Sequence, residues 1–258
     1  MSKIADEVGL LLTKGGYADP LLTTTSLALA AQRLGVELIE GAPVTDIETL
    51  GDRVECVHTS QGTIHTPIIV NCAGPWAPRL AKMVGIDLPI KTHRVPTCLF
   101  RRPLAMNSQG PVLSDGVNRV YLRDVGETIV RAALFVWSVD RVDPDEYDES
   151  IDRDQLQAIR EPLKRRVNCM NLATFAGGFS AIYGMTPDAH PIVSEMPQVK
   201  GFWCDCGWSG NGFASAPVLG QCLADQIMGK TSAIDLSAFQ WPRAENAKPR
   251  VESTWVFR

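Results

Sequence analysis

The alternation of hydrophobic and polar residues predicts a helix followed by short strands in the first seventy residues. Asp19-Pro20 is typical of a helix start, because aspartate caps free N–H groups and proline fits the first helical position. Leucine and alanine then recur at mostly helical spacing as far as Leu34, and Gly35 ends the helix. Alternating segments next predict strands over residues 36–40, 44–50, 53–59 and 62–67. The second and third of these strands are predicted to be joined by a turn at Gly51-Asp52.

An unbroken apolar segment, residues 68–74, predicts a buried parallel strand that runs into a tight turn. Small residues end this strand, and a helix is predicted over residues 76–84. Backbone N–H groups at such a helix start favour a phosphate or another anion. A plain strand-to-helix connection without a ligand fits the same pattern, so both interpretations stay open at this point.

From about residue 89 the pattern changes to short alternating segments, which predict an antiparallel sheet. An amphipathic helix over residues 151–167 follows, and its apolar side is predicted to pack on that sheet. The predicted fold class is therefore α/β, or mixed α+β. The predicted strands of this middle part are residues 97–100, 112–113, 119–123 and 128–136.

A glycine-rich turn, residues 207–213, lies between a predicted strand (201–206) and a predicted helix (216–228). Glycines let a backbone approach a flat ligand closely, and the helix dipole adds partial positive charge. Such a place suits a reduced flavin, which is anionic at N1 and O2. A phosphate loop or an ordinary turn is the alternative, although G-x-x-x-x-G-K-[ST] is not matched. The tail after Phe239 is predicted to be loosely held.

A turn with two prolines, Thr186-Pro187-Asp188-Ala189-His190-Pro191, precedes this strand. His190 beside an acid permits a catalytic interpretation. An aspartate that stabilises the turn next to a partly exposed histidine is the preferred interpretation.

Composition narrows the classes of function. The 258 residues carry a net charge of −4 with a pI of about 5.6, so no basic surplus attracts nucleic acid or an anionic membrane. No apolar run reaches the roughly 20 residues of a transmembrane span, and the acidic N-terminus does not resemble a signal peptide. Seven cysteines, an odd number, favour reduced thiols and a cytoplasmic setting. No metal site is predicted, because His58, His65, His93 and His190 are scattered along the chain.

Six motifs follow one another in a fixed order along the chain. They are Gly16-Tyr17-Ala18-Asp19-Pro20, Gly35-Val36-Glu37-Leu38, Val44-Thr45-Asp46-Ile47, Ile69-Val70-Asn71-Cys72-Ala73-Gly74-Pro75-Trp76, Met185-Thr186-Pro187-Asp188 and Gly207-Trp208-Ser209-Gly210-Asn211-Gly212-Phe213. In this order they resemble the D-amino-acid oxidase superfamily of FAD-dependent oxidoreductases, nearest to sarcosine oxidase, the sarcosine oxidase β subunit, glycine oxidase and dye-linked proline dehydrogenase. The resemblance covers roughly residues 10–240.

The resemblance implies an FAD-binding domain from residues 1–88 and 185–240, a substrate domain from residues 89–184, and a tail over 241–258. The strand end near Gly74 and the glycine turn should then converge on one flavin. The resemblance implies that the backbone of Val44 lies near the adenine. The implied cofactor-binding residues are Val44, Cys72, Ala73, Gly74, Trp76, Asp188, Gly207, Ser209, Gly210, Asn211, Gly212 and Phe213. No catalytic residue is assigned, and the polar candidates on the substrate side are His93, Arg94 and Tyr121.

The expected reaction is oxidation of a C–N bond in a small amine or amino acid, with hydride passing to flavin N5. The sequence departs from the family pattern in having no G-x-G-x-x-G near its start. We therefore expect a truncated chain, or a partner chain that carries the missing segment, with a non-catalytic fragment or subunit as the alternative. An NAD-linked dehydrogenase is a weaker alternative.

The sequence also departs from its relatives near the expected substrate. Asn211 and Ala214 replace a histidine and a lysine of the sarcosine oxidase turn, and residues 176–181 lack the arginine of D-amino-acid oxidases.

Overall fold

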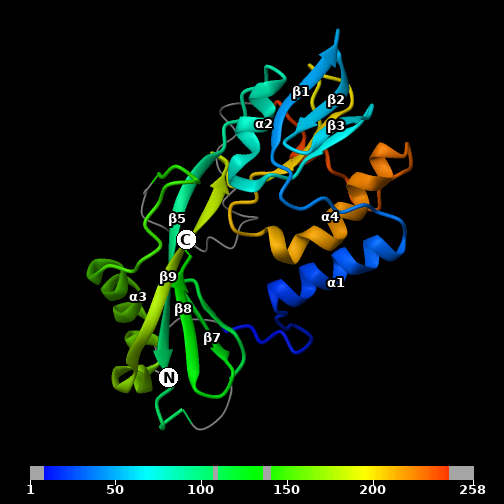
Figure 1. Cartoon of the computed structure of the whole chain (residues 1–258). Coiled ribbons are helices and arrows are strands. Elements are labelled where there is room, and N and C mark those ends of the chain that lie inside the picture. Colours follow the sequence, from blue (N-terminus) through cyan, green and yellow to red (C-terminus); the bar gives the residue numbers. More distant parts are fainter. Residues whose placement is uncertain (1–8, 107–109, 136–140, 244–258) are drawn as a thin grey trace. The chain divides into compact units, whose positions relative to one another are not determined.

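The computed structural model describes residues 9–106, 110–135 and 141–243, and the chain folds as two compact units (Figure 1). The split unit consists of residues 14–90 and 184–243, and the middle unit is built on Lys91–Tyr183. The split unit contains α1 (Pro20–Arg33), β1 (Val44–Leu50), β2 (Arg53–Thr59), β3 (Gly62–His65), β4 (Ile69–Asn71), η1 (Gly74–Trp76), α2 (Ala77–Met83), β10 (Ile192–Glu195), β11 (Phe202–Cys206), α4 (Gly212–Ile227) and η3 (Ser237–Phe239).

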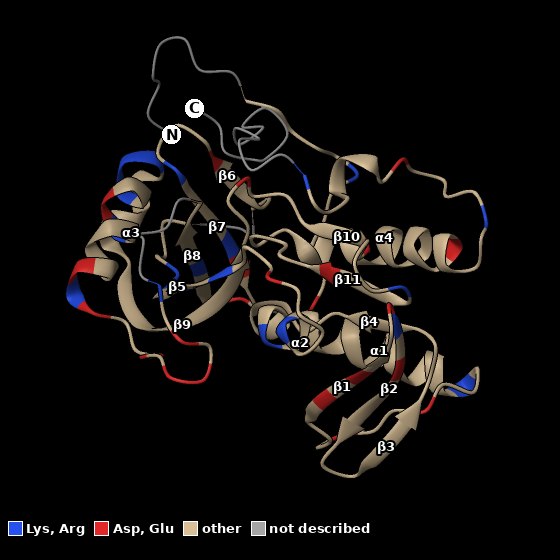
Figure 2. Ribbon diagram, turned by 90° about the horizontal axis from the view of Figure 1, so that it is seen from above, with Lys and Arg blue, Asp and Glu red and all other residues tan. Residues whose placement is uncertain are grey.

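Helix α1 begins as the sequence predicts, but it has no buried face. The Asp19 carboxylate accepts a hydrogen bond of 2.9 Å from the backbone N–H of Leu22, and Pro20 occupies the first turn. None of its residues is buried, and its four leucines are 48–75% exposed. Arg33 is its one charged residue, in contrast to the highly charged α3 (Figure 2). An apolar helix without a buried face is one that lacks a packing partner.

Two small sheets make up the rest of the split unit. Strands β1, β2 and β3 form an antiparallel sheet in that order, and the predicted hairpin turns at Gly51 with φ of 63°. The second sheet has the order β10-β11-β4, in which β11 runs parallel to β4 and antiparallel to β10. One hydrophobic cluster, which includes Ile47, Ala77, Ile192 and Phe202, joins these strands to α2.

The middle unit is a five-stranded antiparallel sheet with one long helix. Its strand order is β6-β7-β8-β5-β9, and α3 begins at a capping box formed by Asp152 and Gln155. Ile159 and Leu163 of α3 pack with Phe100 and Val130 of the sheet, as the amphipathic pattern predicts. The elements are β5 (Lys91–Arg101), β6 (Leu113–Asp115), β7 (Val120–Val125), β8 (Ile129–Leu134), α3 (Arg153–Arg166), η2 (Asn168–Leu172) and β9 (Thr174–Met185).

The predicted α/β, mixed α+β fold class is confirmed, and two local predictions are wrong. Residues 36–40 form no strand, because no neighbouring strand in the described part of the chain pairs with them. Residues 241–243 are not loosely held: the backbone N–H of Trp241 donates to Ser194 Oγ at 3.2 Å, and Arg243 forms an ion pair. The rest of the predicted tail, residues 244–258, lies outside the described residues. Among the described helices, none has the length and apolar character that crossing a bilayer would need.

Candidate functional site

The site begins where two parallel strands end side by side. In the β4–β11 pair, Val70 lies opposite Trp203, and Asn71 lies opposite Cys204. The carboxyl ends of both strands therefore lie at the same end of the sheet. Residues 72–76 follow β4 there, and residues 207–213 follow β11. Ligands of open α/β sheets bind at the carboxyl ends of parallel strands.

Asn71 fixes the first of these two turns. Its side chain is 1% exposed; Nδ2 donates to the carbonyl of Ala77 at 2.9 Å, and Oδ1 accepts from the N–H of Ala73 at 3.2 Å. These bonds hold the predicted residues Cys72, Ala73, Gly74 and Trp76 in one compact turn. Asn71 lies in the motif but was not assigned a role. An asparagine within an otherwise apolar predicted strand is the sequence signal that would have identified it, because a buried amide needs hydrogen-bond partners.

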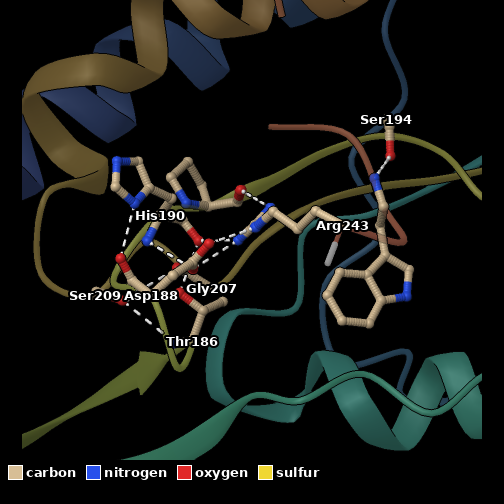
Figure 3. Close-up of polar contacts among 9 residues, drawn as sticks. Thr186, Asp188, His190, Ser194, Gly207, Ser209 and Arg243 are labelled. Carbon is tan, nitrogen blue, oxygen red and sulfur yellow. Dashed lines mark hydrogen bonds and ion pairs between the residues drawn. The ribbon is translucent and has the colours of Figure 1, made fainter. Parts of the chain in front are cut away.

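The end of β9 and the residues that follow it, 184–188, pack directly against both turns. A Cβ atom on Gly184 would lie 3.3 Å from the carbonyl of Gly74. The N–H of Ser209 donates to the carbonyl of Gly184 at 3.1 Å. The N–H of Thr186 donates to Ser209 Oγ at 3.3 Å, between two residues labelled in Figure 3. Residues 72–76, 184–188 and 207–213 therefore meet, as expected of segments that converge on one ligand.

The glycine turn packs closely against Thr186 and is followed by the N-terminus of α4. A Cβ atom on Gly207, which has φ of 72°, would lie 2.6 Å from Cγ2 of Thr186. Helix α4 begins at Gly212, earlier than predicted, and its N-cap residue Asn211 makes no side-chain capping hydrogen bond. The first N–H groups of α4, near Phe213, can therefore donate to a ligand.

Asp188, a predicted cofactor residue, is engaged with Arg243. Its carboxylate accepts from Arg243 Nε at 2.5 Å and from Nη2 at 2.9 Å, and also from the N–H of His190 (Figure 3). Burial opposes ionisation of Asp188, but the hydrogen bonds from Arg243 and His190 outweigh it and hold its pKa below the ordinary value. Arg243 also donates to the carbonyls of His190 and Pro191, so the pair closes the turn.

Val44, the predicted adenine neighbour, lies at the start of β1. It is paired with Thr59 of β2, and its half-buried side chain packs against the hydrophobic cluster of the split unit. The structure thus gives Val44 a packing role, and its predicted role toward adenine stays a prediction.

The three substrate-side candidates all lie in the middle unit, in different surroundings. Arg94 donates to the carbonyl of Ser150 at 2.6 Å and lies 3.6 Å from Asp148, so it holds the segment before α3. His93 is half-buried on β5, and burial together with Arg141 lowers its pKa. Tyr121 on β7 packs against Phe135 with ring centroids 5.4 Å apart.

Two residues that the sequence analysis did not single out accompany Tyr121. Burial, with a contribution from Tyr121, raises the pKa of Tyr183 to about 12, while Arg131 opposes that shift. Arg131 lies over the Phe179 ring at 5.5 Å, and its buried Nε has no hydrogen-bond partner among the described residues. An unsatisfied buried N–H of an arginine can donate a hydrogen bond to a carboxylate. No sequence signal distinguishes Arg131 from the other strand arginines.

Comparisons with known proteins agree with this arrangement. Residues 4–226 match the family model DAO, described as FAD dependent oxidoreductase. Human sarcosine dehydrogenase, a mitochondrial protein, is 30% identical over 234 residues, which are 85% of this chain and 25% of that protein. Monomeric sarcosine oxidase of Streptomyces avermitilis is 27% identical over 95% of this chain and 65% of its own length. The chain thus spans about a quarter of the mammalian relative.

Solved structures share the fold. L-proline dehydrogenase from P. horikoshii has a TM-score of 0.77 at 22% identity, over 91% of this chain and 60% of that one. Glycine oxidase from Geobacillus kaustophilus has a TM-score of 0.71 at 23% identity, over 85% of this chain and 57% of that one. Since the family match covers most of the chain, and the fold agrees with it, this protein belongs to the family of FAD-dependent oxidoreductases named after D-amino-acid oxidase.

Proposed function

We propose that this chain carries the flavin-side turn and the substrate-side sheet of an enzyme that oxidises a C–N bond in a small amine or amino acid. The observation that carries the proposal is the meeting of three backbone segments, 72–76, 184–188 and 207–213, at the ends of β4 and β11. The relatives named above, a sarcosine dehydrogenase and a sarcosine oxidase among them, support an amine or amino-acid substrate.

The residues of the split unit fit the family's cofactor. Gly184 and Gly207 let segments 72–76, 184–188 and 207–213 pack in direct contact, because a Cβ atom on either glycine would crowd Gly74 or Thr186. The first turn of α4 offers N–H donors and a positive dipole to an anionic ring edge. Residues 72–76 would hold the ADP half of FAD, and residues 207–213 the ring and ribityl chain. When bound, FAD accepts the hydride removed from the carbon next to the substrate nitrogen. No general base is assigned, which is consistent with hydride loss from a neutral amine.

Substrate recognition is assigned to one cluster of the middle unit, Tyr121, Arg131 and Tyr183. Arg131 offers its unsatisfied Nε to the carboxylate of an amino acid, a charge-assisted hydrogen bond. Burial holds both tyrosines in the protonated form, because it raises the pKa of each hydroxyl. Neutral hydroxyl groups can donate hydrogen bonds to the same ligand. Arg94 is a weaker candidate, because it already binds Ser150 and Asp148.

Flavin retention tests the cofactor site. Gly207→Ala should lower FAD affinity roughly 10–100-fold, because the new methyl group would overlap Thr186 at a positive φ. The measurement is FAD titration of the purified chain, followed by flavin absorbance and fluorescence.

Gly220→Ala in α4 is the matched control, since a Cβ there meets nothing within 4 Å. Equal FAD affinity in the two variants would contradict the assignment. No flavin binding by the wild-type chain, even in excess FAD, would favour the alternative of a subunit that needs a partner.

Substrate specificity gives a second prediction. Arg131→Met should raise the KM for an amino-acid substrate roughly 10–100-fold, the loss of one charge-assisted hydrogen bond, and leave flavin content unchanged. Arg101→Met, at the exposed end of β5, is the control. The assignment fails if both variants have the same KM, or if amines without a carboxylate are affected equally.

The exposed face of α1 supports a requirement for additional polypeptide, in the same chain or in a partner. Apolar residues are exposed both in α1 and in segment 36–40, and β4 is an edge strand among the strands that the structure describes. A strand–G-x-G-x-x-G–helix segment would cover this surface and supply the nucleotide half of the site. Co-expression with such a segment should raise flavin content and lower the binding of a hydrophobic dye; no change in either would oppose the requirement.

A further inference from the structure

Three potential metal ligands meet on one face of the β1–β2–β3 sheet, whose strands are labelled in Figure 1. Of the residues assigned to the flavin, this sheet carries Val44 alone. Glu48 of β1 lies directly opposite Cys56 of β2, and His58 follows two residues later on the same face. Their donor atoms, Glu48 Oε2, Cys56 Sγ and His58 Nε2, all lie within 4.8 Å of one another. The hairpin register therefore unites three residues that are dispersed in the sequence.

The distances between these donor atoms match one face of a tetrahedral zinc site. Cys56 Sγ lies 3.5 Å from Glu48 Oε2 and 3.5 Å from His58 Nε2, and His58 Nε2 lies 3.3 Å from Glu48 Oε2. Tetrahedral zinc, with its usual bond lengths, separates sulfur from nitrogen or oxygen by about 3.5–3.6 Å and nitrogen from oxygen by about 3.3–3.4 Å. Metal binding would thus require little rearrangement of the three side chains.

A second residue orients the histidine. Thr63 of β3 lies opposite His58, and its Oγ1 is 2.9 Å from His58 Nδ1. With a proton on Nδ1 directed at Thr63, Nε2 presents its lone pair to Glu48 and Cys56, which is how metal-binding histidines are usually held.

The three ligands differ in burial, so a fourth ligand would reach the metal from the exposed side of the cluster. Cys56 is 2% exposed, whereas the side chains of His58 and Glu48 are 34% and 58% exposed. A fourth ligand would come from water, or from His65, which lies opposite Cys56 on β3.

We propose that Glu48, Cys56 and His58 form a binding site for Zn²⁺ or a chemically similar divalent ion, which links the strands of this sheet. One thiolate, one imidazole and one carboxylate form a ligand set suited to a borderline-soft metal and poorly suited to Mg²⁺ or Ca²⁺. The proposal does not depend on flavin binding, because it uses residues outside segments 72–76, 184–188 and 207–213. Without a metal, the same three groups would form only a weakly hydrogen-bonded cluster.

Cobalt substitution tests the site directly. The full chain, freed of metal with a chelator, is titrated with Co²⁺ and then with Zn²⁺. We expect one Co²⁺ per chain, a thiolate-to-cobalt charge-transfer band, and loss of that band as Zn²⁺ displaces Co²⁺. Cys56→Ser should abolish the band, whereas Cys169→Ser, at a half-buried cysteine of the middle unit, should retain it. The proposal is overturned if wild type shows no band, or if Cys56→Ser keeps it.

Thr63→Val separates metal binding from folding, because Thr63 is exposed. Loss of a residue that orients a metal-binding histidine lowers metal affinity roughly 10–100-fold. Zn²⁺ affinity, measured by competition with a coloured chelator, should fall by that factor in Thr63→Val and stay unchanged in Thr45→Val, an exposed threonine of β1. Circular dichroism confirms that both variants are folded. Equal Zn²⁺ affinity in the two variants would overturn the assigned geometry.

Discussion

Gly201→Ala is expected to lower the free energy of unfolding by about 2–5 kcal/mol, because two penalties act at one residue. Gly201 has φ of 79°, where an alanine costs about 1–2 kcal/mol. An added Cβ would also lie only 2.0 Å from the carbonyl oxygen of Pro67, and such overlap costs about 1–3 kcal/mol or more. Urea denaturation followed by tryptophan fluorescence measures the change.

The same substitution should also lower flavin binding. The carbonyl of Gly201 accepts from the N–H of Ile69 at 2.8 Å, and the next residue, Phe202, begins the β4–β11 pair. Moving this backbone would separate the strands whose ends form the candidate site.

Gly35→Ala is the matched control. Gly35 also has a positive φ, 93°, but a Cβ there meets nothing within 4 Å, so only the backbone penalty of about 1–2 kcal/mol applies. If both variants lose the same stability, the close approach of Gly201 to Pro67 does not constrain the fold.

The local pattern of the sequence predicts most elements, because each depends on neighbours in the chain. The hairpin at Gly51, the cap at Asp19 and the amphipathic helix over 151–167 all form as predicted. The segment 36–40 has strand-like residues but forms no strand, since a strand needs a partner that the residue pattern does not report.

The side-chain clusters were harder to predict, because they depend on register and tertiary contacts. Glu48 reaches Cys56 only through the hairpin register, and residue spacing alone left the histidines scattered. Arg243 was predicted to lie in a loose tail, yet it pairs with Asp188 across 55 residues. By contrast, the meeting of the Gly74 and Gly207 turns could be expected. The six ordered motifs resemble those of one enzyme family, and that resemblance implies how distant segments come together.

Asp188→Asn is expected to destabilise the protein by about 3–5 kcal/mol, because it leaves a largely buried guanidinium without its counter-ion. The side chains of Asp188 and Arg243 are only 10% and 15% exposed. The pKa of Asp188 is lowered in the folded state, so the pair stabilises the protein above the unfolded pKa of about 3.9 and loses that effect as pH falls through the folded value. The difference between wild type and Asp188→Asn should thus be largest near neutral pH and shrink in acid. Urea denaturation at a series of pH values measures it.

Asp52→Asn provides the comparison, because Asp52 lies 3.4 Å from Lys200 in an exposed ion pair whose side chains are 65% and 61% exposed. Such a pair contributes about 0–1 kcal/mol, and its loss should be small at every pH. The double variant Asp188→Asn with Arg243→Met should lose less stability than the sum of the single changes, because no unpaired charge remains. Additive losses, or a cost of Asp188→Asn no larger than that of Asp52→Asn, would show that the Asp188–Arg243 pair does not hold the turn between β9 and β10.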